Sequence, residues 1–289
     1  MNTMKYINKL ILLSLSIVNF INVNTLFLIK KKSINSKITN KEVIISLTSF
    51  PARIKFVHQT IKSILIRNEN KCYIFIYLST DEFPDLEKNI PTNLLALKKY
   101  GLRIIFVDGN VRSYKKLIYA MSTFPDKSII TIDDDIYYPK KWLDNLINLH
   151  NDNPHDILFF RGHRMYDSHH KILPYKKMIS AESTYGIDNY NFYIPTGIGG
   201  ILYPANSLYK DFNNIILINK LAPYADDLWF KKMGELNNTN YRRVLNRNIT
   251  FPPILGTQKI SLYKKNVINK TQELIDNDSQ LKKILEHYN

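Results

Sequence analysis

The sequence predicts an α/β protein with a largely parallel central sheet, helices on both faces of that sheet, and an apolar helix in front of it. Short β-branched runs alternate with helical apolar spacing along most of the chain, and each run stops at a turn signal. The length of 289 residues suits one large domain or two small ones and can bury a sizeable core. A continuous apolar stretch stands near the N-terminus.

The predicted elements follow one another as strand and helix. Each strand is an apolar run of four to nine residues bounded by turn residues, and each helix repeats apolar residues three or four apart. The predicted strands are 43–50, 72–79, 102–108, 128–133 and 156–164. The predicted helices are 57–66, 94–100 (ended by Gly101), 114–124 and 139–152 (opened by Pro139). Ligands of such sheets gather where strands end, which here means loops 48–55, 79–85, 108–116 and 133–139.

Residues 10–29 read LILLSLSIVNFINVNTLFLI, with 14 apolar residues in 20, about the length that crosses a bilayer. Three amides, Asn19, Asn22 and Asn24, interrupt the run. An uncleaved anchor, a helix lying on the membrane and a signal peptide remain open as alternatives. Residues 33–41 are polar and read as a linker, so the chain divides into a membrane-associated segment, 1–41, and a domain with its C-terminal tail, 42–289.

The positive charge is concentrated beside this apolar segment. The chain carries 40 Lys+Arg against 25 Asp+Glu, a net charge of +15, and residues 1–41 hold seven of the lysines and no acid. Five of those lysines follow the apolar run and two precede it, which places the body of the protein at the cytoplasmic face of a membrane, anchored or peripheral. With the excess charge located there and no nucleic-acid-binding motif in sequence, we expect no nucleic acid partner.

Composition excludes several classes. Hydrophobic residues make up 45% and aromatic residues 12%, which is too apolar for a disordered chain and excludes a collagen or a coiled-coil rod. The single cysteine, Cys72, excludes a disulfide framework within the chain and a cysteine-based zinc finger.

A triple carboxylate, Asp133–Asp135, ends the fourth predicted strand in IITIDDDIYYP. In an extended chain Asp133 and Asp135 point to the same side and Asp134 to the other. Two carboxylates on one side suit Mg²⁺ or Mn²⁺, which take oxygen ligands and complete their shell with water and substrate phosphates. The alternative is a solvated acidic turn in front of the next helix.

A second acidic pair, Asp226 and Asp227, precedes an aromatic helical run in LAPYADDLWF. One of the two could be a general base that takes a proton from an acceptor hydroxyl. In isolation the pair fits the N-cap of a helix better, since Asp is a favoured capping residue.

The strand that ends in DDD, the preceding SYKKLIYAM, the segment PTGIGGILYP and the later ADDLWF together resemble bacterial glycosyltransferases of the GT-A fold. The likeness is to the family-2-like enzymes of surface polysaccharide synthesis, and it also takes in VIISLTSFPARI, TQKISLYKKN and NDSQLKKI. It covers about residues 42–285, nearly all of the chain after the apolar segment.

The resemblance implies a donor site and a catalytic base. Asp133 and Asp135 would hold Mn²⁺ or Mg²⁺ against the diphosphate of a nucleotide sugar, with Asp134 facing the ribose or fixing the loop. Asp227, or Asp226, would be the base of an inverting transfer. The further donor contacts that it implies are Thr48, Ser49, Arg53, Asp81 (near Ser79), Lys115 or Lys116, and the glycines Gly199 and Gly200 together with Gly197.

The resemblance thus implies a metal-dependent glycosyltransferase that moves a sugar from a nucleotide-diphosphate sugar to a hydroxyl of a glycan or lipid-linked acceptor. Arg161, His163 and Arg164 could grip a phosphate of such an acceptor or pair with acidic residues. A retaining transferase on the same fold and a non-catalytic nucleotide-sugar- or glycan-binding protein stay open. A nucleic-acid-binding protein and an Asp-nucleophile phosphatase are remote alternatives.

Overall fold

The computed structural model describes residues 2–31, 42–68, 72–167, 169–180, 189–245, 249, 251–260 and 276–288. The predicted linker 33–41 and most of TQKISLYKKN lie outside them. The helices are α1 Asn2–Lys30, α2 Ile54–Asn68, α3 Thr92–Leu95, α4 Lys115–Thr123, α5 Trp142–Asp152, α6 Tyr175–Ser180, α7 Ile215–Leu221, α8 Asp226–Leu236 and α10 Asn277–Tyr288. The strands are β1 Val43–Thr48, β2 Tyr73–Ser79, β3 Leu102–Val107, β4 Ser128–Thr131, β5 Ile157–Phe159, β6 Gly162–Arg164, β7 Tyr193–Pro195, β8 Ile201–Tyr203 and β9 Tyr241–Arg243.

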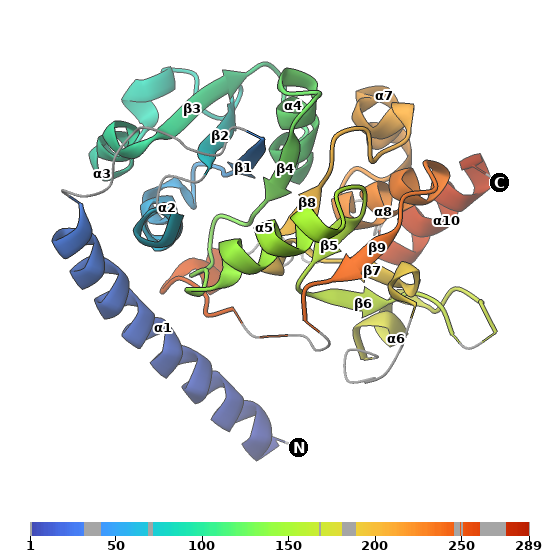
Figure 1. The fold of residues 1–289 in the computed structure, drawn as a ribbon, viewed down its shortest axis with the longest axis horizontal. Coiled ribbons are helices and arrows are strands. Elements are labelled where there is room, and N and C mark those ends of the chain that lie inside the picture. The colour runs from blue at the N-terminus through green and yellow to red at the C-terminus, as the bar shows by residue number, and fades with distance from the viewer. Residues whose placement is uncertain are drawn as a thin grey trace, which may run out of the picture.

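Seven of the strands in the described residues form one sheet in the order β3-β2-β1-β4-β8-β5-β9 (Figure 1). The pairs β3–β2, β2–β1, β1–β4 and β5–β9 are parallel, and β8 is antiparallel to both β4 and β5. The carboxyl ends of β1, β4, β5 and β9 therefore meet at one edge, which we call the carboxyl edge. The predicted α/β class with a largely parallel sheet and an N-terminal apolar helix is confirmed.

Apolar side chains cover both faces of the sheet because successive strand residues point to opposite sides. In β1, Ile45 packs with α2 and α5 in one core cluster, whereas its neighbour Ile44 packs with α4, α8 and α10 in the other. Parallel strands buried on both faces read as continuous apolar runs, which is why the alternation of strands and helices was visible in the sequence.

One predicted strand is wrong in its extent. The run 156–164 is divided, because β5 ends at Phe159 and Gly162–Arg164 pairs instead with β7 in a separate ladder. The chain turns tightly here: a Cβ at Gly162 would lie 2.7 Å from the Phe159 ring and 2.9 Å from the Ile194 carbonyl oxygen. The predicted strand 128–133 also ends early, at Thr131, so the three aspartates follow the strand rather than continue it.

The apolar segment forms a single helix, α1, whose N-terminal half lies clear of the rest of the ribbon in Figure 1. Lys9–Lys30 is long and apolar enough to cross a membrane, and 17% of its most apolar window is buried against the protein. The C-terminal half packs on α2, where Val23 and Phe27 are buried. Asn24 bonds Gln59 at 3.1 Å and Lys62 at 2.9 Å, and the Phe27 ring meets Tyr100 edge-on.

Candidate active site

The acidic cluster lies at the point where the strand order of the sheet reverses. From β1 the chain builds outward through β2 to β3, then returns to place β4 on the other side of β1. The loops after β1 and β4 therefore lie side by side at the carboxyl edge, and ligands of open α/β sheets usually bind where the strand order reverses in this way. Thr48–Arg53 and Asp133–Asp135 are those two loops.

Arg53 joins the β1 loop to the β4 loop through two carboxylates. Its Nη1 lies 2.6 Å from Asp134 Oδ1 and its Nη2 2.9 Å from Asp135 Oδ2. The Ser49 hydroxyl donates to the second Asp134 oxygen at 2.5 Å, and the Thr60 hydroxyl donates to the Asp134 carbonyl at 2.9 Å. A buried aspartate with this many partners fixes the loop, which is one of the two roles that the resemblance implied for Asp134.

The predicted arrangement of the triple carboxylate needs a correction. We expected Asp133 and Asp135 to share one side, yet the pair held by a common cation is Asp134 and Asp135. The physical reason is that β4 ends at Thr131 and Asp134 and Asp135 sit in a turn, so the two-residue alternation of an extended chain does not apply. Burial raises the pKa of Asp135 to about 7, although Arg53 opposes the rise.

Lys116 binds the remaining carboxylate of the triple from the other side. Its Nζ lies 2.9 Å from Asp133 Oδ1 and 3.4 Å from Asp226 Oδ2, so it connects α4, the β4 loop and the start of α8. The side chain is buried, which by itself disfavours the ammonium, but the carboxylates of Asp133, Asp226 and Asp227 outweigh burial and raise the Lys116 pKa well above its usual value. The Asp133 side chain is 26% exposed and is the most accessible of the three.

Gly197 lies against this group, and a side chain there would displace the ends of the Asp133 and Lys116 side chains. A Cβ at Gly197 would lie 2.7 Å from Asp133 Oδ1 and 2.8 Å from Lys116 Nζ. Burial raises the pKa of Asp227 well above its ordinary value, and the Asp226 carboxylate adds to this rise, while Lys116 and a backbone hydrogen bond from Gly197 oppose it. The predicted pair Asp226 and Asp227 therefore joins the predicted triple in one site.

The capping interpretation of Asp226 and Asp227 is not realised. Helix α8 begins at Asp226 itself, its N-cap position is Ala225, and no side chain caps it. Both carboxylates occupy the first turn of α8, where they interact favourably with the helix dipole. Their position leaves them available to the site.

Three other predicted donor contacts lie elsewhere. Lys115 is buried and its Nζ bonds Glu82 at 2.9 Å and Asn110 at 2.7 Å, so it ties the loops after β2 and β3 together. The Thr48 hydroxyl donates to the Tyr77 carbonyl in the neighbouring strand. Asp81 is exposed after β2, with its backbone N–H bonded to the Ser79 hydroxyl. Of the two lysines, only Lys116 reaches the carboxylates.

Gly199 and Gly200 pack against the protein rather than the carboxylates. The Gly199 carbonyl accepts a 2.7 Å hydrogen bond from the Trp142 indole, and a Cβ at Gly200, whose φ is +78°, would lie 2.7 Å from the same ring. Their role in this structure is close packing and a left-handed turn. The residue of this segment at the site is Gly197.

Sequence reasoning missed several polar contacts that hold the β4 loop. The Tyr138 hydroxyl accepts from the backbone N–H of Asp133 at 3.0 Å, and the Tyr138 backbone N–H donates to the Ser63 hydroxyl at 3.1 Å. Nothing in the sequence marked Tyr138 or Ser63, because both read as ordinary core or helix residues. In the basic stretch after β5, Arg164 Nε donates to the Tyr166 carbonyl and His163 is buried.

The site is rich in negative charge, and this charge favours the binding of a cation. Five carboxyl groups, Asp133–Asp135, Asp226 and Asp227, face two cations, Arg53 and Lys116. If all ionise, three negative charges remain in excess in a partly buried region, which is costly without a further cation. Within the described ranges no three His, Cys, Asp or Glu side chains are grouped so that together they could hold a metal ion. Mg²⁺ sites need only one or two carboxylates when substrate phosphates and water supply the rest, so the donor set fits such an ion.

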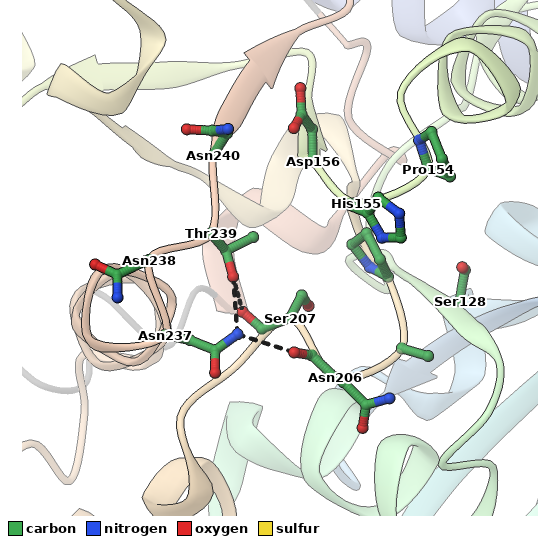
Figure 2. Close-up of a pocket in the computed structure, with 12 residues that line it drawn as sticks. Ser128, Pro154, His155, Asp156, Asn206, Ser207, Asn237, Asn238, Thr239 and Asn240 are labelled. Atoms are coloured by element: carbon green, nitrogen blue, oxygen red, sulfur yellow. Dashed lines mark hydrogen bonds between the residues drawn. The ribbon is translucent and has the colours of Figure 1, made fainter.

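A separate hollow of about 510 Å³ lies at the opposite edge of the sheet (Figure 2). Its lining includes Ser128 at the start of β4 and Asp156 just before β5, together with amides and hydroxyls of 206–207 and 237–240. Asp156 is paired with Arg242 at 2.8 Å. This hollow contains none of the predicted site residues.

No protein-family model matches the chain, and no curated protein matches its sequence. The solved structures with a similar outline include a mannosyltransferase from Pyrobaculum calidifontis in complex with GDP-Man and Mn²⁺ (10% identity, 83% of this chain and 68% of that chain, TM-score 0.44). They also include residues 1–349 of TarS from S. aureus (15% identity, 85% of this chain and 70% of that chain, TM-score 0.46). A third is a putative glucose-1-phosphate thymidylyltransferase from Bacillus anthracis (11% identity, 73% of this chain and 87% of that chain, TM-score 0.39). These are GT-A-like glycosyltransferases, the class that the resemblance in the sequence implies, and a nucleotidyltransferase. With TM-scores below 0.5, the likeness decides nothing about activity, which is argued from the site.

Proposed function

We propose that this protein is a glycosyltransferase that uses a nucleotide-diphosphate sugar and a divalent cation, Mn²⁺ or Mg²⁺. The observation that carries the proposal is the excess of carboxylates at the switch point of a parallel sheet. Asp133–Asp135 arrive from β4, Asp226 and Asp227 from α8, and Arg53 and Lys116 connect them. A site with surplus carboxylates at this place favours a ligand that brings a metal and phosphates with it.

The resemblance assigns the ion to Asp133 and Asp135, and of these Asp133 is the more accessible and would be the first to meet it. When bound, the ion would neutralise charge on the nucleoside diphosphate that leaves. Ser49 and Arg53, beside the triple carboxylate, would be on the nucleotide side of the site. The Lys116 ammonium pairs with the carboxylates of both Asp133 and Asp226. It thereby reduces the repulsion between them and holds the β4 loop against α8.

Asp227 is the residue we assign as general base. Its raised pKa makes it a better proton acceptor than an ordinary aspartate, and it lies beside Gly197, where a substrate can approach backbone closely. In an inverting transfer it takes the proton of the acceptor hydroxyl as that oxygen attacks the anomeric carbon. The neighbouring Asp226, engaged with Lys116, would serve to position this end of the site.

The acceptor is a hydroxyl of a glycan or of a lipid-linked sugar, and the protein acts at the cytoplasmic face of a membrane through α1. The support for this part is the long apolar helix and the lysines around it.

The test is thermal stability of the full chain in detergent, against a panel of nucleoside diphosphates and nucleotide sugars with and without Mn²⁺. A ligand that binds only the folded state raises stability with the logarithm of its concentration over Kd. We expect a shift that requires metal and one nucleotide together, and its loss in Asp133→Asn but not in the control Asp126→Asn, an exposed residue at the opposite edge of the sheet. No shift with any pair in a well-folded sample would refute the proposal, and binding without transfer would favour a nucleotide-sugar-binding protein instead.

A further inference from the structure

The helix α1 is divided by its contacts into two halves with different surroundings. Residues 22–30, the docked half, contact α2 through Asn24, Phe27 and Lys30. Residues 6–21, the free half, carry ten large apolar side chains that are 40–68% exposed. Those ten are Tyr6, Ile7, Leu10, Ile11, Leu13, Leu15, Ile17, Val18, Phe20 and Ile21.

The distribution of these side chains identifies a bilayer as the partner rather than a second protein. At 100° per residue, the exposed apolar positions between 10 and 21 span an arc of about 220°, far wider than the stripe of about 100° with which a helix packs on a globular surface. Lys5 and Lys9 stand near the N-terminal end of the free half, and Lys30 and Lys31 stand at the end of the docked half. An apolar helix that is exposed over most of its circumference, with lysines near its N-terminal end, fits lipid with anionic headgroups.

Asn19 and Asn24, two of the three amides that interrupt the apolar run, have local partners. Asn19 Nδ2 donates to the Leu15 carbonyl and the Ser16 hydroxyl donates to the Leu12 carbonyl, each at 2.8 Å. Back-bonding of this kind lowers the cost of placing the side chain in hydrocarbon. Asn24 also donates to the Phe20 carbonyl four residues back, but in addition it hydrogen-bonds with Gln59 and Lys62 of α2 and therefore belongs to the docked half.

The register of the α1–α2 contact fixes where the free half points. Asn24 meets Gln59 and Lys62, and Lys30 donates to the Ile66 carbonyl at 3.3 Å, so the two helices run in the same direction. Helix α2 starts at Ile54, next to Arg53, at the carboxyl edge. At 1.5 Å per residue, α1 passes the start of α2 about five residues before Asn24, so most of the free half projects beyond the carboxyl edge.

We infer that the free half of α1 inserts in a bilayer that lies on the carboxyl-edge side of the sheet, so that the acidic site faces the membrane surface. The free half is about 24 Å long, somewhat less than the ~30 Å hydrocarbon core, a mismatch that membranes accommodate at fractions of a kcal/mol per Å. Resting on the proposed function, this placement makes the acceptor a lipid-borne sugar or sugar phosphate rather than a glycan free in solution.

The test measures which edge of the sheet is nearer to lipid. In the full chain with Cys72→Ala, a single fluorophore is attached at Lys55→Cys, at the carboxyl edge, or at Asp126→Cys, at the opposite edge; both positions are exposed. The protein is reconstituted in 3:1 phosphatidylcholine–phosphatidylglycerol vesicles that carry an acceptor dye on a headgroup. Since β1 alone separates the edges by about 20 Å, we expect about twofold more energy transfer from position 55 than from position 126.

A matched pair of variants tests the contact with α2. Asn24→Leu, which removes the bonds to Gln59 and Lys62, should abolish the difference between the two labels while vesicle binding stays. Asn19→Leu, whose amide bonds only within α1, should preserve the difference. Equal or reversed energy transfer in the parent chain, or failure to bind vesicles, would overturn the inference, and an unchanged difference in Asn24→Leu would overturn the role of this contact. If the protein binds no nucleotide with metal while position 55 still transfers more energy than position 126, the proposed function alone would be refuted.

Discussion

Replacing Arg53 with methionine is expected to lower the free energy of unfolding by about 3–5 kcal/mol near pH 8, the usual cost of removing one partner from a buried ion pair. Arg53 is the shared cation of Asp134 and Asp135, which are at most 10% exposed and lie next to each other. Methionine keeps much of the volume of the side chain but leaves both carboxylates without that partner. The measurement is urea unfolding of the full chain in detergent with a chelator, followed through the buried Trp142 and Trp229.

The loss should depend on pH in a direction that the site fixes. In the folded protein the pKa of Asp135 is raised from 3.8 to about 7, so between these values the folded state binds the proton more tightly than the unfolded chain. The bound proton stabilises the folded protein fully at pH values below the pKa that Asp135 has in the unfolded chain. This stabilisation is lost as the pH rises through the pKa that Asp135 has in the folded protein. Without Arg53 the carboxylates repel more strongly, so the destabilisation should be smaller near pH 5.5 than near pH 8.

Two outcomes would refute this reasoning. A loss below about 1 kcal/mol near pH 8 would mean that Arg53 is not the main partner of the carboxylates, because even an exposed ion pair is worth up to that much. A loss equal at both pH values would mean that the cost does not come from charge. The matched control is Arg103→Met on β3, where the arginine is exposed and should change stability by no more than about 0.5 kcal/mol.

Three further substitutions separate donor binding, stability and chemistry. Gly197→Ala places a Cβ 2.7 Å from Asp133 Oδ1 and should weaken metal-dependent donor binding about tenfold, or 1.4 kcal/mol, in a thermal-shift titration; undiminished affinity would remove Gly197 from the donor site. Lys115→Met should cost about 1–3 kcal/mol in urea unfolding, because it leaves Glu82 without its buried partner, with donor affinity changed less than twofold; a large loss of affinity would restore Lys115 as a donor contact. Asp227→Asn should lower transfer about 100-fold or more while donor affinity stays, and retained transfer would exclude it as the base.

The positions of the strands and helices could be predicted from the sequence because each buried strand is a compact apolar run and each helix shows its own spacing. Strands β1, β2, β3 and β4 fall within the predicted 43–50, 72–79, 102–108 and 128–133. The single strand predicted over 156–164 was wrong since an apolar run does not show where the chain turns from one ladder into another. Periodicity reports burial, and both pieces are largely buried.

Which cation meets which carboxylate could not be predicted, because it depends on contacts between residues far apart in sequence. Arg53 and Asp134 are separated by 81 positions and meet only because β1 and β4 are adjacent. The two neighbouring lysines Lys115 and Lys116 look equivalent in sequence, yet consecutive residues of a helix point about 100° apart. One reaches Glu82 and the other Asp133, so only one of them belongs to the site.

Helix α2 links the β4 loop to α1 through two stripes of residues that are offset by one position. Thr60 and Ser63 bond the backbone of Asp134 and Tyr138, and Arg67 Nη1 donates to the Tyr138 carbonyl, all on the stripe 60, 63 and 67. The neighbouring stripe, Gln59, Lys62 and Ile66, makes the hydrogen bonds to α1. Because one rigid helix carries both sets of contacts, the direction in which α1 leaves the protein and the position of the aspartates are fixed relative to each other. A rigid connection of this kind is what a transferase needs if its acceptor is held at a membrane, since the reacting groups must then meet at a set height above the lipid.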